Sequence, residues 1–278
     1  MEWLDYCKSF IPKLKANYQR MMGKSLNLEN PKTFTEKLQW LKIYDSSFLK
    51  TYCTDKITVH DYVQEKIGKD ICIPIIATYN KPEEIDLSKL PERFVIKCNH
   101  GCKMNIIVKD KSKMNFNDIK QKLNKWLGED FSQHNGCELH YKNIPHKILI
   151  EEYKENSGHS DLTDYKFYCL NGQPIFCQVI EDRHSNITFS HYDMNWKYSP
   201  KYDWKEYRSN PNIKKPEHFD KMIEYAKILS KDFILARPDF YVIDGKIYLG
   251  EITFTPNSGY HHFVNKNTDL ELGILLKL

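Results

Sequence analysis

The chain has 278 residues, of which 41% are hydrophobic and 13% aromatic, which is enough for one large domain or for two to three lobes with their own cores. Its net charge is only +4, and its lysines are spread among acidic residues, so nucleic-acid binding is not indicated. The sequence has no apolar run near the roughly 18 residues of a membrane span and no signal-like N-terminus, so we expect a cytoplasmic protein without a membrane span.

The N-terminal third of the sequence predicts helices. Apolar residues at spacings of three and four between residues 2 and 15 indicate an amphipathic helix. A second helix is expected from Thr33, because Thr33 and Glu36 have the spacing of a capping box. A third helical pattern covers residues 55–68 and ends at a glycine, after which residues 71–76 predict a short buried strand.

The middle of the chain predicts strands separated by loops. Strands are expected at residues 94–97 and 106–109, on either side of a loop that contains Gly101. A helix follows from Asn117, with its apolar residues on one face. Residues 129–146 are expected to form a polar loop.

The C-terminal half predicts a largely antiparallel sheet. Three of its strands are expected at residues 148–153, 165–170 and 174–180. Asn171-Gly172 joins the last two and is a strong hairpin signal. Residues 191–215 predict an irregular excursion, and a helix is expected from Pro216. Because strands and helices do not alternate strictly, the predicted fold class is α+β.

A final hairpin carries the most informative charges. Residues 240–250 alternate and turn at residues 244–245, so Asp239 and Glu251 are expected to lie side by side. Two neighbouring carboxylates with Arg237 beside them can hold a hard divalent cation and the phosphates attached to it. A surface hairpin with scattered charges is the alternative interpretation.

Other charged residues stand at predicted strand ends. Lys97 precedes the Gly101 loop, where an ammonium group and loop amides suit a phosphate, although an ordinary strand-end lysine is the alternative. Of Glu151 and Glu152, one is expected to face a buried side and to read an adenine amine or a ribose hydroxyl; an ordinary strand end is the alternative.

A second group of charges is predicted on the hairpin that Asn171-Gly172 closes. Asp164 and Lys166 share one strand face, and Arg183 ends the next strand. The two cations would make a floor for a carboxylate or a transferring phosphate. Cross-strand ion pairing explains the pattern equally well.

The cysteines do not indicate a zinc site. The eight cysteines include no C-x-x-C pair, and a chain of this length does not need disulfides, so we expect reduced thiols. Cys98, His100 and Cys102 would be spaced too widely along an extended segment for a tetrahedral site, and no second pair follows.

The order of these motifs is informative as a set. In chain order they are Asp55-Lys56, residues 94–97 with Asn99 and Gly101, residues 150–153, Asp164-Tyr-Lys166, Asp182-Arg183, Arg237-x-Asp239 and residues 251–259. The set resembles the ATP-grasp superfamily. Residues 30–42 and 164–168 are similar to its teichuronopeptide-biosynthesis (TupA-like) branch, which is found among bacterial surface-polysaccharide genes, and the resemblance spans residues 25–278.

The resemblance implies an ATP-grasp fold, in which two α+β lobes hold a nucleotide between them, with a helical N-terminal segment. It divides the chain into a helical region at residues 1–90, a small lobe with the phosphate loop at residues 91–150, and a large lobe with the metal site at residues 151–278.

The resemblance also implies roles for individual residues. ATP contacts are expected from Lys56, Lys97, Asn99, Gly101, Glu151, Glu152, Tyr153 and Asp164. Mg2+, with Mn2+ as a possible replacement, is expected on Asp239, Glu251 and Asn257. Catalytic roles are expected for Arg237, which would steady the transferred phosphoryl group, and for Lys166 and Arg183, which would lie over an acyl phosphate.

Two positions depart from the superfamily pattern. Thr253 stands where many of these ligases have an asparagine, so the third metal ligand is open between Thr253 and Asn257. Cys102 and Lys103 stand where a serine and a glycine are expected, which predicts a stiffer phosphate loop.

The implied activity is that of an ATP-dependent carboxylate-amine ligase that forms an amide through an acyl phosphate. The expected partners are ATP, an amine, and a uronic acid or amino acid of a bacterial capsule or other surface polysaccharide, free or as a sugar nucleotide. An ATP-grasp kinase, a glycosyltransferase of polysaccharide biosynthesis and a non-catalytic nucleotide-binding module are the alternatives.

Overall fold

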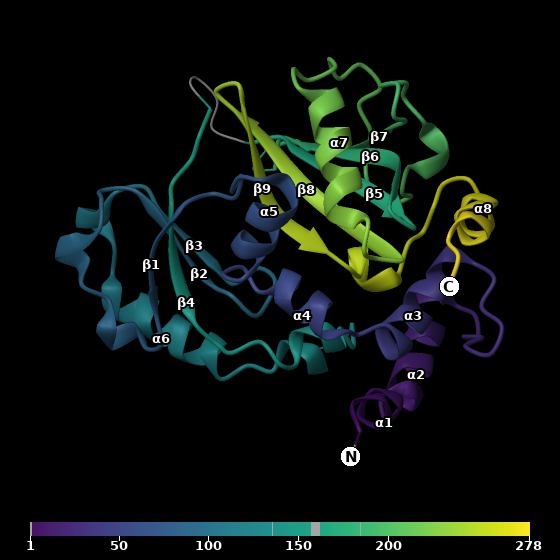
Figure 1. Ribbon diagram of the computed structural model, residues 1–278, viewed down its shortest axis with the longest axis horizontal. Helices are drawn as coiled ribbons and strands as arrows, with labels where there is room; N and C mark the ends of the chain where they lie inside the picture. Colours follow the sequence, from purple (N-terminus) through teal and green to yellow (C-terminus); the bar gives the residue numbers. More distant parts are fainter. Residues whose placement is uncertain (1, 135, 157–161, 184) are drawn as a thin grey trace.

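Two antiparallel sheets organise the computed structural model, which describes residues 2–134, 136–156, 162–183 and 185–278. Strands β1 to β4 are Ile75–Tyr79, Phe94–Cys98, Asn105–Val108 and Ile148–Glu152, and strands β5 to β9 are Asp164–Leu170, Gln173–Glu181, Thr188–Tyr192, Leu235–Ile243 and Lys246–Thr253. One sheet has the order β1-β4-β2-β3 and the other β7-β6-β5-β8-β9 (Figure 1). The architecture is α+β, as predicted.

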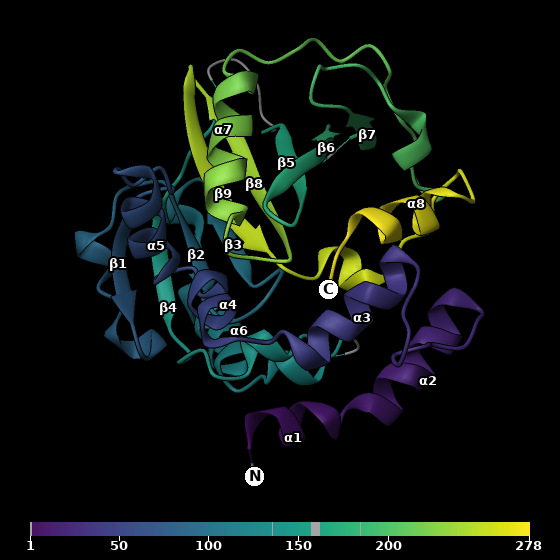
Figure 2. The same ribbon diagram turned by 45° about the vertical axis from the view of Figure 1, so that its right-hand side comes forward.

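Helices flank both sheets and form the N-terminal region. They are α1 Trp3–Lys8, α2 Ile11–Met22, α3 Phe34–Tyr44, α4 Phe48–Thr54, α5 Val59–Ile67, α6 Phe116–Leu127, α7 Phe219–Ser230 and α8 Thr268–Leu275. In Figure 2, α7 lies across the five-stranded sheet, whereas α1 to α3 lie at the opposite side of the molecule, near α8. No helix within the described residues is both long and apolar enough to cross a membrane.

The N-terminal helices differ in part from the prediction. The single helix expected over residues 2–15 is two, because Pro12 lies in the first turn of α2 and cannot serve as the interior of a longer helix. The capping box is confirmed: the Thr33 hydroxyl accepts from the Glu36 amide, and the Glu36 carboxylate accepts from the Thr33 amide. The helix expected over residues 55–68 is the shorter α5, which begins only at Val59, since α4 ends just before Asp55 and a turn follows.

Three further elements depart from the sequence prediction. The strand expected over residues 71–76 begins only at Ile75, because Pro74 has no amide to donate. Strand β7 occupies the start of the expected excursion. Helix α7 begins at Phe219 and not at Pro216, because His218 has a left-handed backbone with φ of 64°.

The predicted loop at residues 129–146 is a packed connection. It contains two short 3-10 helices, and Leu139 is buried against Leu14 and Tyr18 of α2. The hydrophobic side chains within this polar stretch therefore attach α2 to the rest of the protein, which hydrophilic composition alone does not predict.

The four-stranded sheet has one buried face and one face that remains open to the site. Phe94, Ile96 and Cys98 of β2 are buried in a core with Ile119 and Leu123 of α6. Because strand side chains alternate, the intervening residues of β2 point to the other face. The boundary expected at residue 90 leaves β1 outside the small lobe, although β1 pairs with β4.

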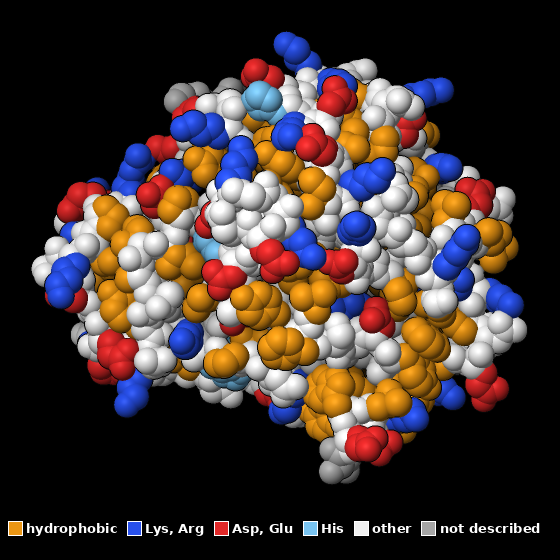
Figure 3. Space-filling model, viewed as in Figure 1, with side chains coloured by type: hydrophobic (Ala, Val, Ile, Leu, Met, Phe, Trp, Pro, Cys, Tyr) orange, Lys and Arg blue, Asp and Glu red, His pale blue; other side chains and the backbone are white. Residues whose placement is uncertain are grey.

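The five-stranded sheet also has two distinct faces. Phe167 and Phe240 pack in one core with Met222 and Leu229 of α7, and α5 contributes Val63 to the same core. The opposite face carries charged residues such as Lys166 and Asp239, and it also contributes Tyr168 and Phe176 to a second core with Phe34 of α3. On the surface drawn in Figure 3, lysine and arginine side chains are interspersed with acidic ones over both sheets. That face of the molecule therefore presents no block of one charge.

Candidate active site

A cavity of about 360 Å³ lies between the two sheets. One wall comes from β2, β3 and β4, and the other comes from β5, β8 and β9. The predicted site residues that line it are Lys56, Lys97, Glu151, Glu152, Tyr153, Asp164, Lys166, Arg183 and Glu251. The two strand-borne groups of charges, which are far apart in the sequence, therefore face one space.

Strand register places two of these charges in one row with Asp239, which does not line the cavity. Lys166 of β5 lies opposite Asp239 of β8, which lies opposite Glu251 of β9. The predicted turn at residues 244–245 is confirmed, since both residues have positive φ, as a type I′ hairpin requires. Arg237 lies two residues before Asp239 and therefore on the same sheet face.

Asp239 is the buried centre of the row. Its side chain is only 1% exposed. Arg237 donates two hydrogen bonds to it, from Nε to Oδ1 at 2.7 Å and from Nη2 to Oδ2 at 2.8 Å. Lys166 Nζ forms an ion pair with the same Oδ2 atom. Both carboxylate oxygens of Asp239 are therefore engaged by cations.

Glu251 is the accessible carboxylate of the pair, because 41% of its side chain is exposed. Its Oε1 atom accepts a hydrogen bond of 3.0 Å from the Thr253 hydroxyl and lies 3.6 Å from Arg237 Nη2. Burial raises the pKa of Glu251, but Lys166, Arg237 and Lys56 outweigh burial and lower that pKa to about 2. Glu251 is therefore ionised at neutral pH.

Asp164 joins Lys166 to Arg183. Lys166 Nζ lies 3.2 Å from Asp164 Oδ1, and Arg183 Nε donates to Asp164 Oδ2 at 2.7 Å. Burial raises the pKa of Asp164, but the two cations outweigh burial, and the net pKa lies below its ordinary value. The cross-strand ion pairing expected as one alternative is present, and Lys166 and Arg183 also line the cavity.

Two lysines approach from the other side of the cavity. Lys56 Nζ donates to the carbonyl oxygen of Gly101 at 2.5 Å and lies 3.4 Å from that of Asn99, so it is attached to the predicted phosphate loop. Burial lowers the pKa of Lys56, and Glu251 acts in the opposite direction. Lys97 Nζ forms an ion pair with Glu151 Oε2.

Two of the predicted loop residues support the cavity without lining it. Asn99 is fully buried, and its side chain donates to Asp55 Oδ1 and to the Pro145 carbonyl, both at 2.9 Å, and accepts from the Lys147 amide at 2.8 Å. A Cβ atom on Gly101 would meet Met104 Sδ at 2.6 Å. Both residues shape the loop on which Lys56 rests.

Asn257 is not brought together with Asp239 and Glu251. It is exposed, its backbone is left-handed with φ of 48°, and its side-chain amide donates to the Tyr260 carbonyl. Thr253 contacts Glu251 and Arg237 instead. Of the two candidates for a third ligand, the structure places Thr253 beside the carboxylates.

The part of the cavity around the end of β4 combines polar groups with apolar lining residues. Glu152 pairs with Lys154 at 2.5 Å, and the Tyr153 hydroxyl donates to Glu155 at 2.9 Å. Sequence reasoning did not single out the apolar lining residues Ile73, Val95, Met104 and Ile107. The alternation of β2 carried a signal for one of them, since Val95 lies on the same face as Lys97.

Sequence reasoning also missed a polar cluster beside Glu251. Glu138 accepts hydrogen bonds from Thr255 at 2.5 Å and from Ser258 at 3.3 Å. Lys42 Nζ is buried nearby and donates to the carbonyls of Gly136 at 2.5 Å and Ser258 at 2.7 Å. Burial lowers the pKa of Lys42 to about 8. Glu138 lies in the segment expected to be a polar loop and Lys42 on the helix expected from Thr33, whereas Thr255 and Ser258 lie in the motif of residues 251–259.

The comparisons identify the family. A family model described as TupA-like ATPgrasp matches residues 36–277. The chain belongs to the TupA-like ATP-grasp family. The charged row of Lys166, Asp239 and Glu251 lies within the matched residues, as do Lys56 and Lys97. No curated protein is significantly similar to the chain in sequence.

Solved structures with a similar arrangement are distant in sequence. D-alanine-D-alanine ligase from Helicobacter pylori has 18% identity and a TM-score of 0.47, with 87% of this chain covering 69% of that one. The Bacillus anthracis enzyme complexed with ATP has 18% identity, coverage of 80% and 63%, and a TM-score of 0.43. N5-carboxyaminoimidazole ribonucleotide synthetase from Thermus thermophilus has 9% identity, coverage of 73% and 45%, and a TM-score of 0.41. The chain spans less than two thirds of the last two proteins.

Proposed function

We propose that this TupA-like ATP-grasp protein is an ATP-dependent carboxylate-amine ligase that uses the cavity between its sheets. The observation that carries the proposal is the row of Lys166, Asp239 and Glu251 across three paired strands. Lys166 and Glu251 of this row line the cavity together with Lys56 and Lys97 from the other side. Carboxylates beside cations across a narrow space suit a nucleotide triphosphate with its divalent ion.

The oxygen donors of the row fit Mg2+, or Mn2+ in its place. Glu251 presents an ionised, accessible carboxylate, and Asp239 lies beside it. Carboxylate oxygens are the ligands these hard ions prefer, and the ion would neutralise charge on the ATP phosphates. Lys166 Nζ and Arg237 Nη2 both contact Asp239 Oδ2, so both cations would have to move away from that atom for Asp239 to hold an ion. Lys166 would then be free to contact the transferred phosphoryl group.

The remaining residues divide between nucleotide and phosphates. Lys56 and Lys97 would hold the phosphate oxygens, with the Gly101 loop above them. The apolar residues around Val95 and Ile107 would enclose the adenine base beside Glu151, Glu152 and Tyr153, and Asp164 would lie near the ribose. A cavity of about 360 Å³ is within the usual size range of small-ligand sites.

The proposed reaction has two steps, and both use the cations of the site. A carboxylate oxygen of the substrate attacks the γ-phosphorus of ATP, the bond to the bridging oxygen breaks, and ADP leaves. Lys166 and Arg183 line the cavity in which negative charge would then gather, and Arg237 binds Asp239 beside Lys166. The amine nitrogen attacks the acyl carbon of the resulting acyl phosphate, phosphate leaves with the electrons of the C–O bond, and the amine loses a proton as the amide forms.

The carboxylate substrate is proposed to be a uronic acid or amino acid of a bacterial surface polysaccharide, free or as a sugar nucleotide. The support for this finer assignment is the TupA-like branch itself. Lys166 and Arg183 provide the positive charge that an anionic substrate requires.

An ADP-release screen tests the activity. Uronic acids and nucleotide-linked uronic acids are combined with a panel of amines, ATP and Mg2+, and products are weighed by mass spectrometry. A ligase gives an amide with one ADP per product. A phosphorylated product without an amide would indicate a kinase. In a thermal-shift measurement, stabilisation of the protein by UDP-sugars without any effect of ATP would indicate a glycosyltransferase.

A further inference from the structure

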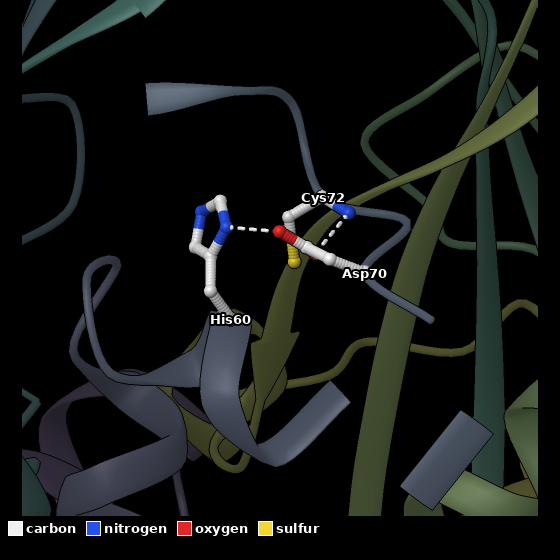
Figure 4. A group of neighbouring side chains, drawn as sticks. All are labelled: His60, Asp70 and Cys72. Carbon is white, nitrogen blue, oxygen red and sulfur yellow. Dashed lines mark hydrogen bonds and ion pairs between the residues drawn. The ribbon is translucent and has the colours of Figure 1, made fainter. Parts of the chain in front are cut away.

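A second cluster of ligand-type side chains lies outside the cavity. His60, Asp70 and Cys72 each offer one donor atom, and the three atoms lie within 4.8 Å of one another. Among the residues that the structure describes, this is the one group of three or more histidine, cysteine or acidic side chains with this geometry. Figure 4 shows the three side chains pointing toward one another.

The backbone around the cluster brings the donors together. His60 lies on α5, and Gly68 ends that helix with φ of 83°, which turns the chain back toward it. Asp70 Oδ1 accepts from the Cys72 amide at 2.8 Å, which leaves Oδ2 to bond with His60 Nδ1 at 2.7 Å. The aspartate is thus held by its own turn with one oxygen facing the histidine.

Strand β9 fixes the position of the cysteine. Cys72 forms an isolated parallel bridge with Leu249, and the Leu249 amide donates to the Ile71 carbonyl at 2.8 Å. The cluster therefore lies where the connection from α5 to β1 joins the strand that carries Glu251. Ile73, the next residue, lines the cavity on the other side of this connection.

The donor set selects a class of metal ion. One imidazole nitrogen, one carboxylate oxygen and one sulfur suit Zn2+ and similar transition metals, whereas Mg2+ prefers oxygen alone. Metal-ligand bonds of about 2.0 to 2.3 Å place tetrahedral ligands about 3.3 to 3.8 Å apart. The His60 and Asp70 donors, now 2.7 Å apart, therefore need to open by about 0.6 Å, whereas the widest donor separation, which is at most 4.8 Å, needs to close by up to about 1 Å. Side-chain rotation supplies both changes once the ion replaces the His60–Asp70 hydrogen bond.

Access to the three donors is unequal. Cys72 is buried, with 7% of its surface exposed, whereas 39% of the Asp70 side chain is exposed. An ion can therefore enter from the aspartate side. Coordination by sulfur displaces the thiol proton to solvent, and the fourth position of a tetrahedral ion is left for water.

We propose that His60, Asp70 and Cys72 bind a Zn2+-class transition-metal ion that fastens the α5–β1 connection to β9. The site is separate from the proposed Mg2+ site, since none of its three residues lines the cavity. It does not depend on the proposed ligase activity.

Titration with Co2+ tests the proposal on the full chain after treatment with a chelator. Sulfur coordination gives a near-ultraviolet charge-transfer band, which should saturate at one ion per chain and disappear when Zn2+ is added. Excess Mg2+ should leave the band in place. Cys72→Ser should abolish the band, and His60→Gln should weaken Co2+ binding by about tenfold or more.

Cys102→Ser is the matched control, because Cys102 is an exposed free thiol. It should bind Co2+ as the wild type does. Circular dichroism establishes that each variant is folded, and Asp70→Asn provides a second, more exposed ligand change. Absence of the band in folded wild type, a band that survives in folded Cys72→Ser, or loss of the band in folded Cys102→Ser would overturn the proposal.

Discussion

Asp239 and Glu251 are paired across one hairpin, but neutralising each should have a different effect on stability. Asp239→Asn removes the shared counter-charge of Arg237 and Lys166, which are both buried. Glu251→Gln removes a carboxylate that is 41% exposed. The proposed function expects both substitutions to abolish ADP formation.

The structure gives the magnitude of the difference. Removing one partner of a buried ion pair costs about 3–5 kcal/mol, because the remaining charge stays buried without compensation. Lys166 keeps Asp164 at 3.2 Å and Arg237 keeps Glu251 at 3.6 Å, so the lower end applies to Asp239→Asn. An exposed pair is worth about 0–1 kcal/mol, which sets the expectation for Glu251→Gln.

Urea unfolding monitored by circular dichroism measures the difference. Glu152→Gln is the matched control, since its carboxylate is 44% exposed and paired with Lys154. We expect Asp239→Asn to lose about 3 kcal/mol, with Glu251→Gln and Glu152→Gln close to wild type. Equal losses for Asp239→Asn and Glu251→Gln, or an unaltered Asp239→Asn, would refute the assignment of Asp239 as the buried counter-ion.

Four further substitutions test the surroundings of the site. Burial lowers the pKa of Lys42 to about 8, so above that pH the unfolded chain binds more protons than the folded protein. In urea unfolding, the free energy of unfolding of wild type should therefore rise by about 2 kcal/mol relative to Lys42→Met between pH 7.5 and 9.5. No change of this difference with pH would contradict the burial argument. His261 is buried beside the rings of Tyr168 and Trp204. Burial and Arg237 lower its pKa to about 3, so wild type should lose about 2 kcal/mol of stability relative to His261→Phe as the pH falls from 6.5 to 5. A constant difference between the two would show that His261 titrates normally. Asn257→Ala should leave Mg2+-dependent ADP formation unchanged, whereas Thr253→Val should weaken it; the reverse pattern would restore Asn257 as the third ligand.

The hairpin of β8 and β9 was predictable because its signals are local. Residues 244–245 fix the turn, and the turn pairs Phe240 with Leu249. A β-bulge between Asp239 and Phe240 then shifts the register by one residue, so that Asp239 lies opposite Glu251 and not opposite Gly250. The turn was predictable from the sequence, whereas the bulge was not. The α+β class followed in the same way from the spacing of apolar residues. The end of the first helix before Pro12 and the start of β1 after Pro74 also have local causes, since proline cannot donate a backbone hydrogen bond.

Contacts between distant segments were beyond sequence reasoning. The ion pair of Lys166 with Asp239 joins residues 73 positions apart, and it depends on β5 lying beside β8. Lys56 rests on carbonyls from the Gly101 loop, and Glu138 reaches Thr255 across 117 positions. Nothing in the local pattern of these residues specifies such partners, because pairing of this kind is decided by the packing of whole elements.

Trapping with hydroxylamine tests the central claim most directly. The protein is incubated with ATP, Mg2+, hydroxylamine and a carboxylate that stimulates ADP release, and hydroxamate and ADP are both measured. An acyl phosphate reacts with hydroxylamine, so the proposed ligase yields one hydroxamate per ADP, and Glu251→Gln yields neither. Formation of ADP with a phosphorylated hydroxyl product and no hydroxamate would contradict carboxylate-amine ligation.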